Sequence, residues 1–373
     1  MTLQAMRFLI FSLFAFILLT NILVSALNYE DMAMAVKKIN KPLIVERVPI
    51  QLQKIQKDQL KRSDKESQTS LRNRTKFPKE TIPITETTVA DSMRANFVSE
   101  FERKPHFHFN QLNSDGYKVA LAIYQPENKI YGAQARINLW NPSVERNIIG
   151  YSTARIRIIS GPSVDNFDAI EVGWLVNSSL NGEDQTTRFF VSWTNDAYRT
   201  KHYYRSVGGR EGFKIYGDGK VPGAPFDHVS TYGSHQYDMI ASISKNKRTK
   251  NWWLEVEGKR VGFWRKDFFP HLEDGGSVVD WGGLVSKSDN SNRHSRIEMG
   301  SGHFPTEGYT KASYFDGLKI RLDNDDENIW TSPGNNLTKD VTNPQCYDIE
   351  IFSGNDNFPG FYYGGPGDHI SCI

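Results

Sequence analysis

From about residue 106 onward, the chain consists of short runs rich in β-branched and aromatic residues, separated by Gly, Asn, Asp or Pro turns. Runs of this composition and spacing are typical of β-strands. No long amphipathic helical pattern lies between them, which argues against alternating strands and helices. We therefore predict an all-β domain, an antiparallel β-sandwich or jelly-roll. The predicted strands are Lys118–Tyr124, Ala133–Trp140, Ala154–Ile159, Ala169–Val176, Arg188–Trp193, Tyr237–Ser244, Trp252–Glu257, Arg260–Trp264, Ser295–Met299 and Leu318–Leu322.

The N-terminus has the pattern of a secretory signal peptide. Arg7 precedes an apolar run from Phe8 to Leu19, and Val24 and Ala26 place small residues where signal peptidase reads them. We predict cleavage after Ala26, so that residues 1–26 are removed and the protein is secreted. An uncleaved membrane anchor is the alternative, although the apolar run is shorter than the ~20 residues needed to span a bilayer. We expect no membrane association after cleavage.

The segment that follows, residues 27–110, is polar and rich in lysine. Its first part, Leu27 to Glu80, holds 13 Lys and Arg against 7 Asp and Glu, whereas the chain from Thr81 onward has an excess of acidic residues. Such a segment cannot build a core alone, so we predict a small, mostly irregular pro-segment before a main domain at 111–373. We hypothesise that the pro-segment docks on the acidic domain as an intramolecular inhibitor and is released in an acidic compartment. The alternative is a solvated, disordered segment.

The whole chain carries 45 Lys and Arg against 43 Asp and Glu, a formal charge of +2. A general binder of nucleic acid is therefore not expected. The chain has two cysteines, Cys346 and Cys372, which in an oxidising compartment are expected to form one disulfide worth about 3 kcal/mol. Three sequons predict N-glycosylation at Asn73, Asn177 and Asn336.

The familiar catalytic signatures are missing, which leaves carboxylates as the best catalytic candidates. In two predicted strands a glutamate and a glycine two residues later share the face opposite the apolar residues: Glu171 with Gly173, and Glu298 with Gly300. Two carboxyls brought close together would divide the roles of base and acid, and could activate water against an amide carbonyl. The alternative is that both are ordinary solvent-facing strand residues.

Other chemistry has weaker support in the sequence. His106 and His108 would share a strand face, but no third ligand is evident, so we predict no metal site and no cofactor. Trp174 and Trp193 are more typical of a core than of a ligand surface, although one or two tryptophans could flank a groove.

A series of ordered motifs runs along most of the chain. They are Thr81-Ile82-Pro83-Ile84, Tyr131-Gly132-Ala133, Leu139-Trp140-Asn141-Pro142, Glu171-Val172-Gly173-Trp174, Arg188-Phe189-Phe190-Val191-Ser192-Trp193-Thr194, Asp196-Ala197-Tyr198, Trp252-Trp253-Leu254-Glu255, Glu298-Met299-Gly300-Ser301-Gly302-His303, Ala312-Ser313-Tyr314-Phe315, Asn343-Pro344-Gln345-Cys346-Tyr347-Asp348-Ile349 and Phe361-Tyr362-Tyr363-Gly364-Gly365-Pro366-Gly367. Together these motifs resemble the plant neprosin family. The resemblance covers nearly everything from Gly116 to the end and, more loosely, the pro-region.

The resemblance implies an activation peptide followed by a glutamic peptidase domain built as a two-sheet sandwich. By position in the motifs, the catalytic pair falls on Glu171 and Glu298. The implied function is a secreted endopeptidase, made as a zymogen and active at acidic pH, that cleaves peptide or protein substrates near proline without a cofactor. Gly173, Gly300, Trp174, Trp193 and Tyr198 are then the candidate substrate-binding residues. We expect a monomer.

Two other functions remain open at this stage. One is a catalytically inactive, lectin-like β-sandwich that binds cell-wall carbohydrate or peptide. The other is a β-sandwich glycosidase that uses the same two carboxylates. Fold alone does not decide among them.

Overall fold

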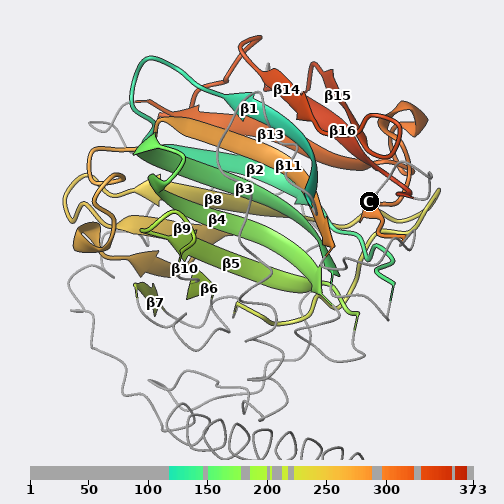
Figure 1. The fold of residues 1–373 in the computed structure, drawn as a ribbon, viewed down its shortest axis with the longest axis horizontal. Helices are drawn as coiled ribbons and strands as arrows, with labels where there is room; N and C mark the ends of the chain where they lie inside the picture. Colours follow the sequence, from blue (N-terminus) through green and yellow to red (C-terminus); the bar gives the residue numbers. More distant parts are fainter. Residues whose placement is uncertain are drawn as a thin grey trace, which may run out of the picture. The chain divides into compact units, whose positions relative to one another are not determined.

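A computed structural model describes residues 117–145, 150–177, 185–199, 202–203, 212–216, 222–287, 296–322, 329–354 and 358–367. The predicted signal peptide, the pro-segment, the sequon at Asn73 and the cysteine at Cys372 lie outside these residues. In the described part, antiparallel strands form two sheets, which confirms the predicted all-β sandwich (Figure 1). The predicted main domain begins before the first described residue, so its boundary stays a prediction.

The first sheet has seven strands in the order β14-β1-β11-β3-β4-β5-β6. They are β1 (Tyr117–Tyr124), β3 (Gly150–Ser163), β4 (Asn166–Asn177), β5 (Arg188–Thr194), β6 (His202–Tyr203), β11 (Val278–Lys287) and β14 (Thr338–Val341).

The second sheet has nine strands. Eight follow the order β12-β16-β13-β2-β8-β9-β10-β7, and β15 also pairs with β16. They are β2 (Gly132–Asn138), β7 (Phe213–Ile215), β8 (Asp238–Lys245), β9 (Trp252–Val256), β10 (Lys259–Trp264), β12 (Met299–Gly300), β13 (Ser313–Arg321), β15 (Asp348–Phe352) and β16 (Gly360–Gly365). Within the described segments, the loops contain the 3₁₀ turns η2 (Lys266–Phe268) and η3 (Pro305–Glu307).

One large hydrophobic core lies between the two sheets. Strand residues alternate between faces, so Ile170, Val172, Trp174 and Val176 of β4 all point into this core, as the sequence pattern predicts. The second sheet contributes side chains such as Phe315 of β13. Burial of this many apolar and aromatic side chains is the main force that holds the sheets together.

The opposite face of the seven-stranded sheet is also buried. A second cluster of apolar residues lies there, including Leu121 of β1, Leu175 of β4 and Leu284 of β11. The alternation that sends Val172 into the core places Glu171 on this second face. We call it the Glu171 face, and the candidate site lies on it.

Several strands differ from the prediction. The predicted strand Ser295–Met299 appears only as an isolated bridge at Ile297 and as the two-residue β12. Strands β6, β7, β11, β14, β15 and β16 were not predicted. No helix among the described residues has the length and apolarity to cross a bilayer.

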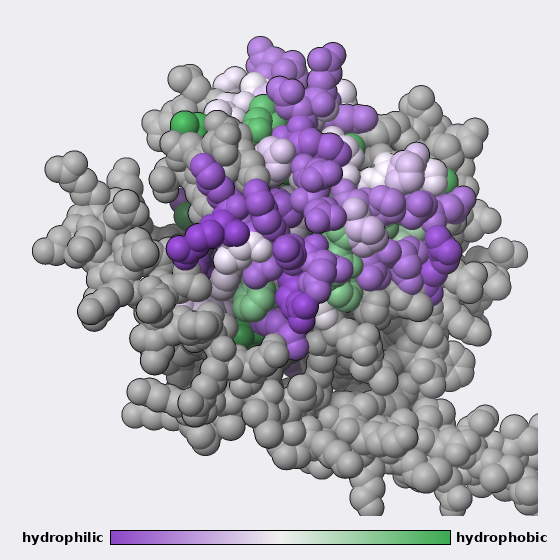
Figure 2. Space-filling view, turned by 90° about the vertical axis from the view of Figure 1, so that its left-hand side faces the viewer, coloured by the Kyte–Doolittle hydropathy of each residue, from purple (hydrophilic) through white to green (hydrophobic). Residues whose placement is uncertain are grey.

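The molecular surface that Figure 2 shows is mainly hydrophilic where the residues are described, and the hydrophobic side chains appear in small, separated areas. In the described part of the chain, the large hydrophobic residues with exposed side chains are Tyr232, Tyr309 and Ile329. Scattered apolar side chains of this kind are normal on a protein surface.

Candidate functional site

Glu171 is held by two donors from different parts of the fold. Arg155 of β3 donates from Nε to Glu171 Oε2 at 2.7 Å, and the Tyr198 hydroxyl donates to Glu171 Oε1. The side chains of Glu171 and Arg155 are 0% and 1% exposed. A carboxylate taken out of water is stable when paired and hydrogen-bonded in this way, so the two donors favour the ionised form.

A second ion pair lies beside the first. Asp280 of β11 accepts from Arg157 Nε at 2.8 Å, and its Oδ1 lies 3.6 Å from Arg155 Nη2. Arg155 therefore stands between the carboxylates of Glu171 and Asp280. Burial alone would lower the pKa of Arg157, but the charges of Asp280, Tyr198 and Glu171 outweigh it and hold that pKa above its usual value. Two arginines and two carboxylates thus form a neutral cluster on the Glu171 face.

Tyr198 reaches Glu171 from a tight turn after β5. Thr194 Oγ1 accepts from the backbone N–H of Tyr198 at 2.8 Å, and both Ala197 and Tyr198 have left-handed backbone, with φ of 57° and 59°. Left-handed conformations cost energy in residues other than glycine, and such strain often marks functional sites. Burial and the nearby Glu171 carboxylate raise the pKa of Tyr198 well above its usual value, so its hydroxyl remains a donor.

Glu298 has different surroundings. Its Oε2 accepts from the backbone N–H of Ser143 at 2.8 Å, and Arg296 Nη2 lies 3.0 Å from its Oε1. The neighbouring residues Ile297 and Met299 point into the core between the sheets, so Glu298 points away from it, next to the nine-stranded sheet. Its side chain is 19% exposed.

The contacts that surround Glu171 and Glu298 come from different segments. Arg155 and Tyr198 contact Glu171, whereas Ser143 and Arg296 contact Glu298. The catalytic pairing of Glu171 with Glu298 stays a prediction.

The two glycines proposed to make room for a substrate have another structural reason. A Cβ on Gly173 would lie 1.8 Å from the backbone oxygen of Ala154 in the paired strand, so only glycine allows this close approach. Gly300 has φ of 65°, and a Cβ there would lie 2.7 Å from the Ser313 side chain. Both glycines are thus required by the backbone itself, whatever a substrate needs.

The two candidate tryptophans belong to the core and not to a substrate surface. Trp174 is 0% exposed and donates from Nε1 to the backbone oxygen of Asn138 at 2.9 Å. Trp193 is also fully buried, with its ring in edge contact with Trp264. Neither ring can touch a ligand in this conformation. Of the five candidate substrate-binding residues, Tyr198 is the one whose side chain has a described hydrogen bond to Glu171.

The sequons differ in accessibility. Asn336 lies in an exposed turn, whereas Asn177 ends β4 and is 2% exposed. A glycan on Asn177 would have to occupy space already filled by the folded domain, so the structure argues against that predicted site. We expect intact-mass analysis before and after glycosidase treatment to show a glycan at Asn336 and none at Asn177. A substantially occupied Asn177 would contradict this expectation.

The predicted disulfide is not tested by the described residues. Cys346 is buried beside the core, and Cys372 lies outside the described part of the chain. The Cys346–Cys372 pairing stays a prediction.

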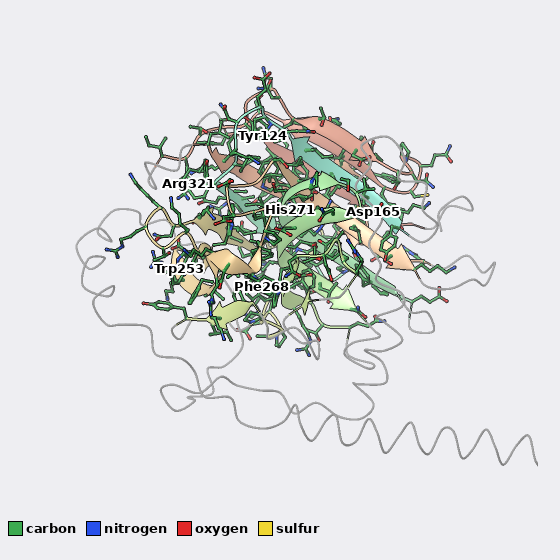
Figure 3. All side chains as sticks on the ribbon, turned by 60° about the vertical axis from the view of Figure 1, so that its left-hand side comes forward. Tyr124, Asp165, Trp253, Phe268, His271 and Arg321 are labelled. Carbon is green, nitrogen blue, oxygen red and sulfur yellow. The ribbon has the colours of Figure 1, made fainter. Side chains whose placement is uncertain are left out.

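Two aspartates away from Glu171 have raised pKa values. Burial raises the pKa of Asp168 to about 6, although it accepts hydrogen bonds from the backbone N–H groups of His271 and Leu272. His271, labelled in Figure 3, also contacts Asn166 through its ring. Burial and the charge of Asp280 raise the pKa of Asp340 to about 6. Both carboxyls bind protons more tightly in the folded chain than in the unfolded one.

This linkage predicts a gain of stability on acidification. A carboxyl whose folded pKa is raised from 3.8 to about 6 contributes stability that is present below pH 4 and is lost as the pH rises through 6. Asp340→Asn should therefore raise the free energy of unfolding at pH 7 by about 1 kcal/mol, after allowance for solvent screening. It should have little effect at pH 4. Urea unfolding at both values measures this, and an equal effect at both would contradict it.

Sequence reasoning missed three residues of the cluster. Arg155 and Arg157 alternate with Ile156 and Ile158, and that alternation was the available signal that they share the face opposite the core. Asp280 lies in a strand that was not predicted. Among the described residues, no three His, Cys, Asp or Glu side chains gather as metal ligands would.

Two solved structures show a weak likeness to this chain. The carbohydrate-binding module CBM40 of a Ruminococcus gnavus IT-sialidase, bound to α2,6-sialyllactose, is 11% identical, with a TM-score of 0.24 over 47% of this chain and 89% of that one. The β-porphyranase BpGH16B of Bacteroides plebeius is 8% identical, with a TM-score of 0.20 over 53% of this chain and 88% of that one. Scores this low carry no argument about function. Among protein families, the Neprosin model matches residues 150–366.

Proposed function

Since the chain belongs to the Neprosin family, we propose that it is a peptidase that hydrolyses peptide bonds at the Glu171 face. The observation that carries this proposal is the position of Glu171. Its carboxylate is buried, is oriented by Arg155 and Tyr198, and lies on a sheet face away from the main core. A carboxylate oriented by neighbouring donors can act as a base toward water.

The proposed chemistry uses one carboxyl group as a proton shuttle. Glu171 takes a proton from water as the water oxygen bonds to the carbonyl carbon, and then gives the proton to the leaving nitrogen as the C–N bond breaks. The products are a carboxylic acid and an amine. The Tyr198 hydroxyl, which remains protonated, steadies the Glu171 carboxylate while it acts as base.

We propose that the chain is made as a secreted, disulfide-bonded zymogen that becomes active in an acidic compartment and cleaves near proline. The burial of both Glu171 and Arg155 is consistent with a latent form, because a substrate cannot reach either group without a structural change. The basic segment within residues 27–110 is the proposed inhibitor. The raised pKa values of Asp168 and Asp340 fit a domain that tolerates acid.

A second candidate function is peptide binding without hydrolysis. It is favoured by one observation: the carboxylate of Glu171 already pairs with a buried arginine, and a carboxylate held in an ion pair is a weaker base toward water.

Peptide cleavage distinguishes the two functions. The purified chain is incubated with a mixture of proline-containing peptides at about pH 3 and about pH 7, and the products are identified by mass spectrometry. We expect cleavage at acidic pH, and the new termini give the specificity. If acid-treated protein that remains folded cleaves nothing yet still binds peptides from the mixture, the binding function replaces the peptidase.

A further inference from the structure

One donor of the buried cluster has no partner. Arg155 uses Nε for Glu171 and lies with Nη2 near Asp280, but its Nη1 has no hydrogen-bond partner although the side chain is 1% exposed. Buried polar groups are nearly always hydrogen-bonded, and an unsatisfied charged donor costs more than a neutral one. An orphaned guanidinium N–H next to the candidate catalytic carboxylate therefore suggests a position kept for a ligand atom.

The strands on either side leave Arg155 without side-chain neighbours in its row. Gly173 of β4 and Gly282 of β11 are the residues paired with Arg155 across the sheet. The guanidinium is thus the only side chain in the middle of three adjacent strands at this level of the Glu171 face. After the structural change that substrate access requires, an extended chain crossing the face there would meet Arg155 and no other side chain in that row.

The charges around Arg155 indicate what kind of ligand it accepts. Arg155 and Arg157 balance Glu171 and Asp280, and the nearby Asp340, whose pKa is raised to about 6, is neutral at acidic pH, so the cluster carries no net charge there before any ligand arrives. A carboxylate ligand would add an uncompensated negative charge beside Glu171. A neutral carbonyl group adds only a dipole, and its oxygen can accept from Nη1.

We propose that Nη1 of Arg155 donates to the carbonyl oxygen of the peptide bond next to Glu171, and thereby selects internal peptide bonds over free carboxylates. The inference rests on the proposed location of the substrate site. During hydrolysis the same oxygen gains negative charge as water adds to the carbonyl carbon, so the Arg155 donor stabilises that state more than the substrate. Arg155 is then a substrate-binding residue as well as the partner of Glu171.

Two inert peptides that differ by one oxygen test this contact. The scissile unit of Ala-Ala-Pro-Tyr-Ala-Ala amide is replaced by –CO–CH₂– in one analogue, which keeps the carbonyl, and by –CH₂–CH₂– in the other, which lacks it. Neither can be hydrolysed. Calorimetric titration of the acid-treated, full-length protein should show the carbonyl analogue binding at least about tenfold more tightly.

Two arginine variants locate the effect. Arg155→Lys keeps the positive charge beside Glu171 but removes the fork of donors, and should reduce the difference between the analogues to less than about threefold. Arg157→Lys is the matched control, because Arg157 contacts Asp280. This variant should keep the full difference in affinity between the two analogues. Equal affinities in the unaltered protein, or a full difference in Arg155→Lys, would overturn the proposal. The comparison in the unaltered protein decides even if the Arg155 variant does not fold.

The result is separable from the proposed function. A clear carbonyl effect in a protein that cleaves no peptide would support the Arg155 contact and reject the peptidase. Peptide cleavage by a protein that binds the two analogues equally would support the peptidase and reject the Arg155 contact.

Discussion

Glu171→Gln should lower kcat/KM for a proline-containing fluorogenic peptide by about a thousandfold, because the glutamine amide cannot take the proton from water. The change is nearly isosteric, and the amide can still accept from Arg155 or from Tyr198. Thermal unfolding of the variant should therefore show a folded domain. The measurement is steady-state kinetics at the acidic pH of highest activity.

Glu298→Gln is the matched control for this experiment. Its carboxylate contacts Ser143 and Arg296, and a partly exposed ion pair of this kind contributes at most about 1 kcal/mol. We expect kcat/KM to stay within about threefold of the unaltered protein. A loss in Glu298→Gln as large as in Glu171→Gln would show that the two glutamates act as a catalytic pair.

Trp174→Ala should reduce the free energy of unfolding by about 3–5 kcal/mol, the usual cost of removing a large aromatic side chain from a core. Trp174 is fully buried between the sheets, and its indole also satisfies the backbone oxygen of Asn138. Denaturant unfolding monitored by circular dichroism gives this value directly.

Trp174→Phe separates the two contributions. It keeps most of the ring volume and removes the N–H donor, so a smaller loss of about 1–3 kcal/mol is expected from the unsatisfied carbonyl. If Trp174 bound substrate instead, both variants would raise KM and leave the unfolding curve nearly unchanged. That outcome would reject the core assignment.

Strand alternation was enough to predict the sandwich and several of its strands, including β4 and β10 with one internal glycine each, but not β11 with its adjacent glycines. In β11 the pair Gly282 and Gly283 resembles a turn, and without β11 the cross-strand row that pairs Asp280 with Arg157 cannot be recognised. The structure shows why glycine is needed there: a Cβ on Gly283 would lie 2.7 Å from Met299 and 2.6 Å from Tyr363. This constraint comes from the other sheet and leaves no trace in the local sequence.

The candidate site was predicted in part for the same reason. The alternation around Glu171 correctly predicted that its side chain lies on the sheet face opposite the core, because alternation is a local property of a strand. The pattern around Glu298 also gave a residue pointing away from the core. Whether two such residues meet depends on which sheet each strand joins, and strand pairing over long distances along the chain cannot be deduced from alternation. The position of the Tyr198 side chain depends on the left-handed backbone of Ala197 and Tyr198, and the local sequence gives no signal for that conformation.

The position of β1 has a consequence for how the domain is made. This first described strand lies between β11 and β14, which are synthesised more than 150 residues later. Neither sheet is complete until nearly the whole chain has been synthesised, so contacts far apart in sequence should make folding slow. A chain that ends before β14 would leave the edge of β1 unpaired and open to association with other strands. Premature termination should therefore yield aggregates and not a smaller folded domain.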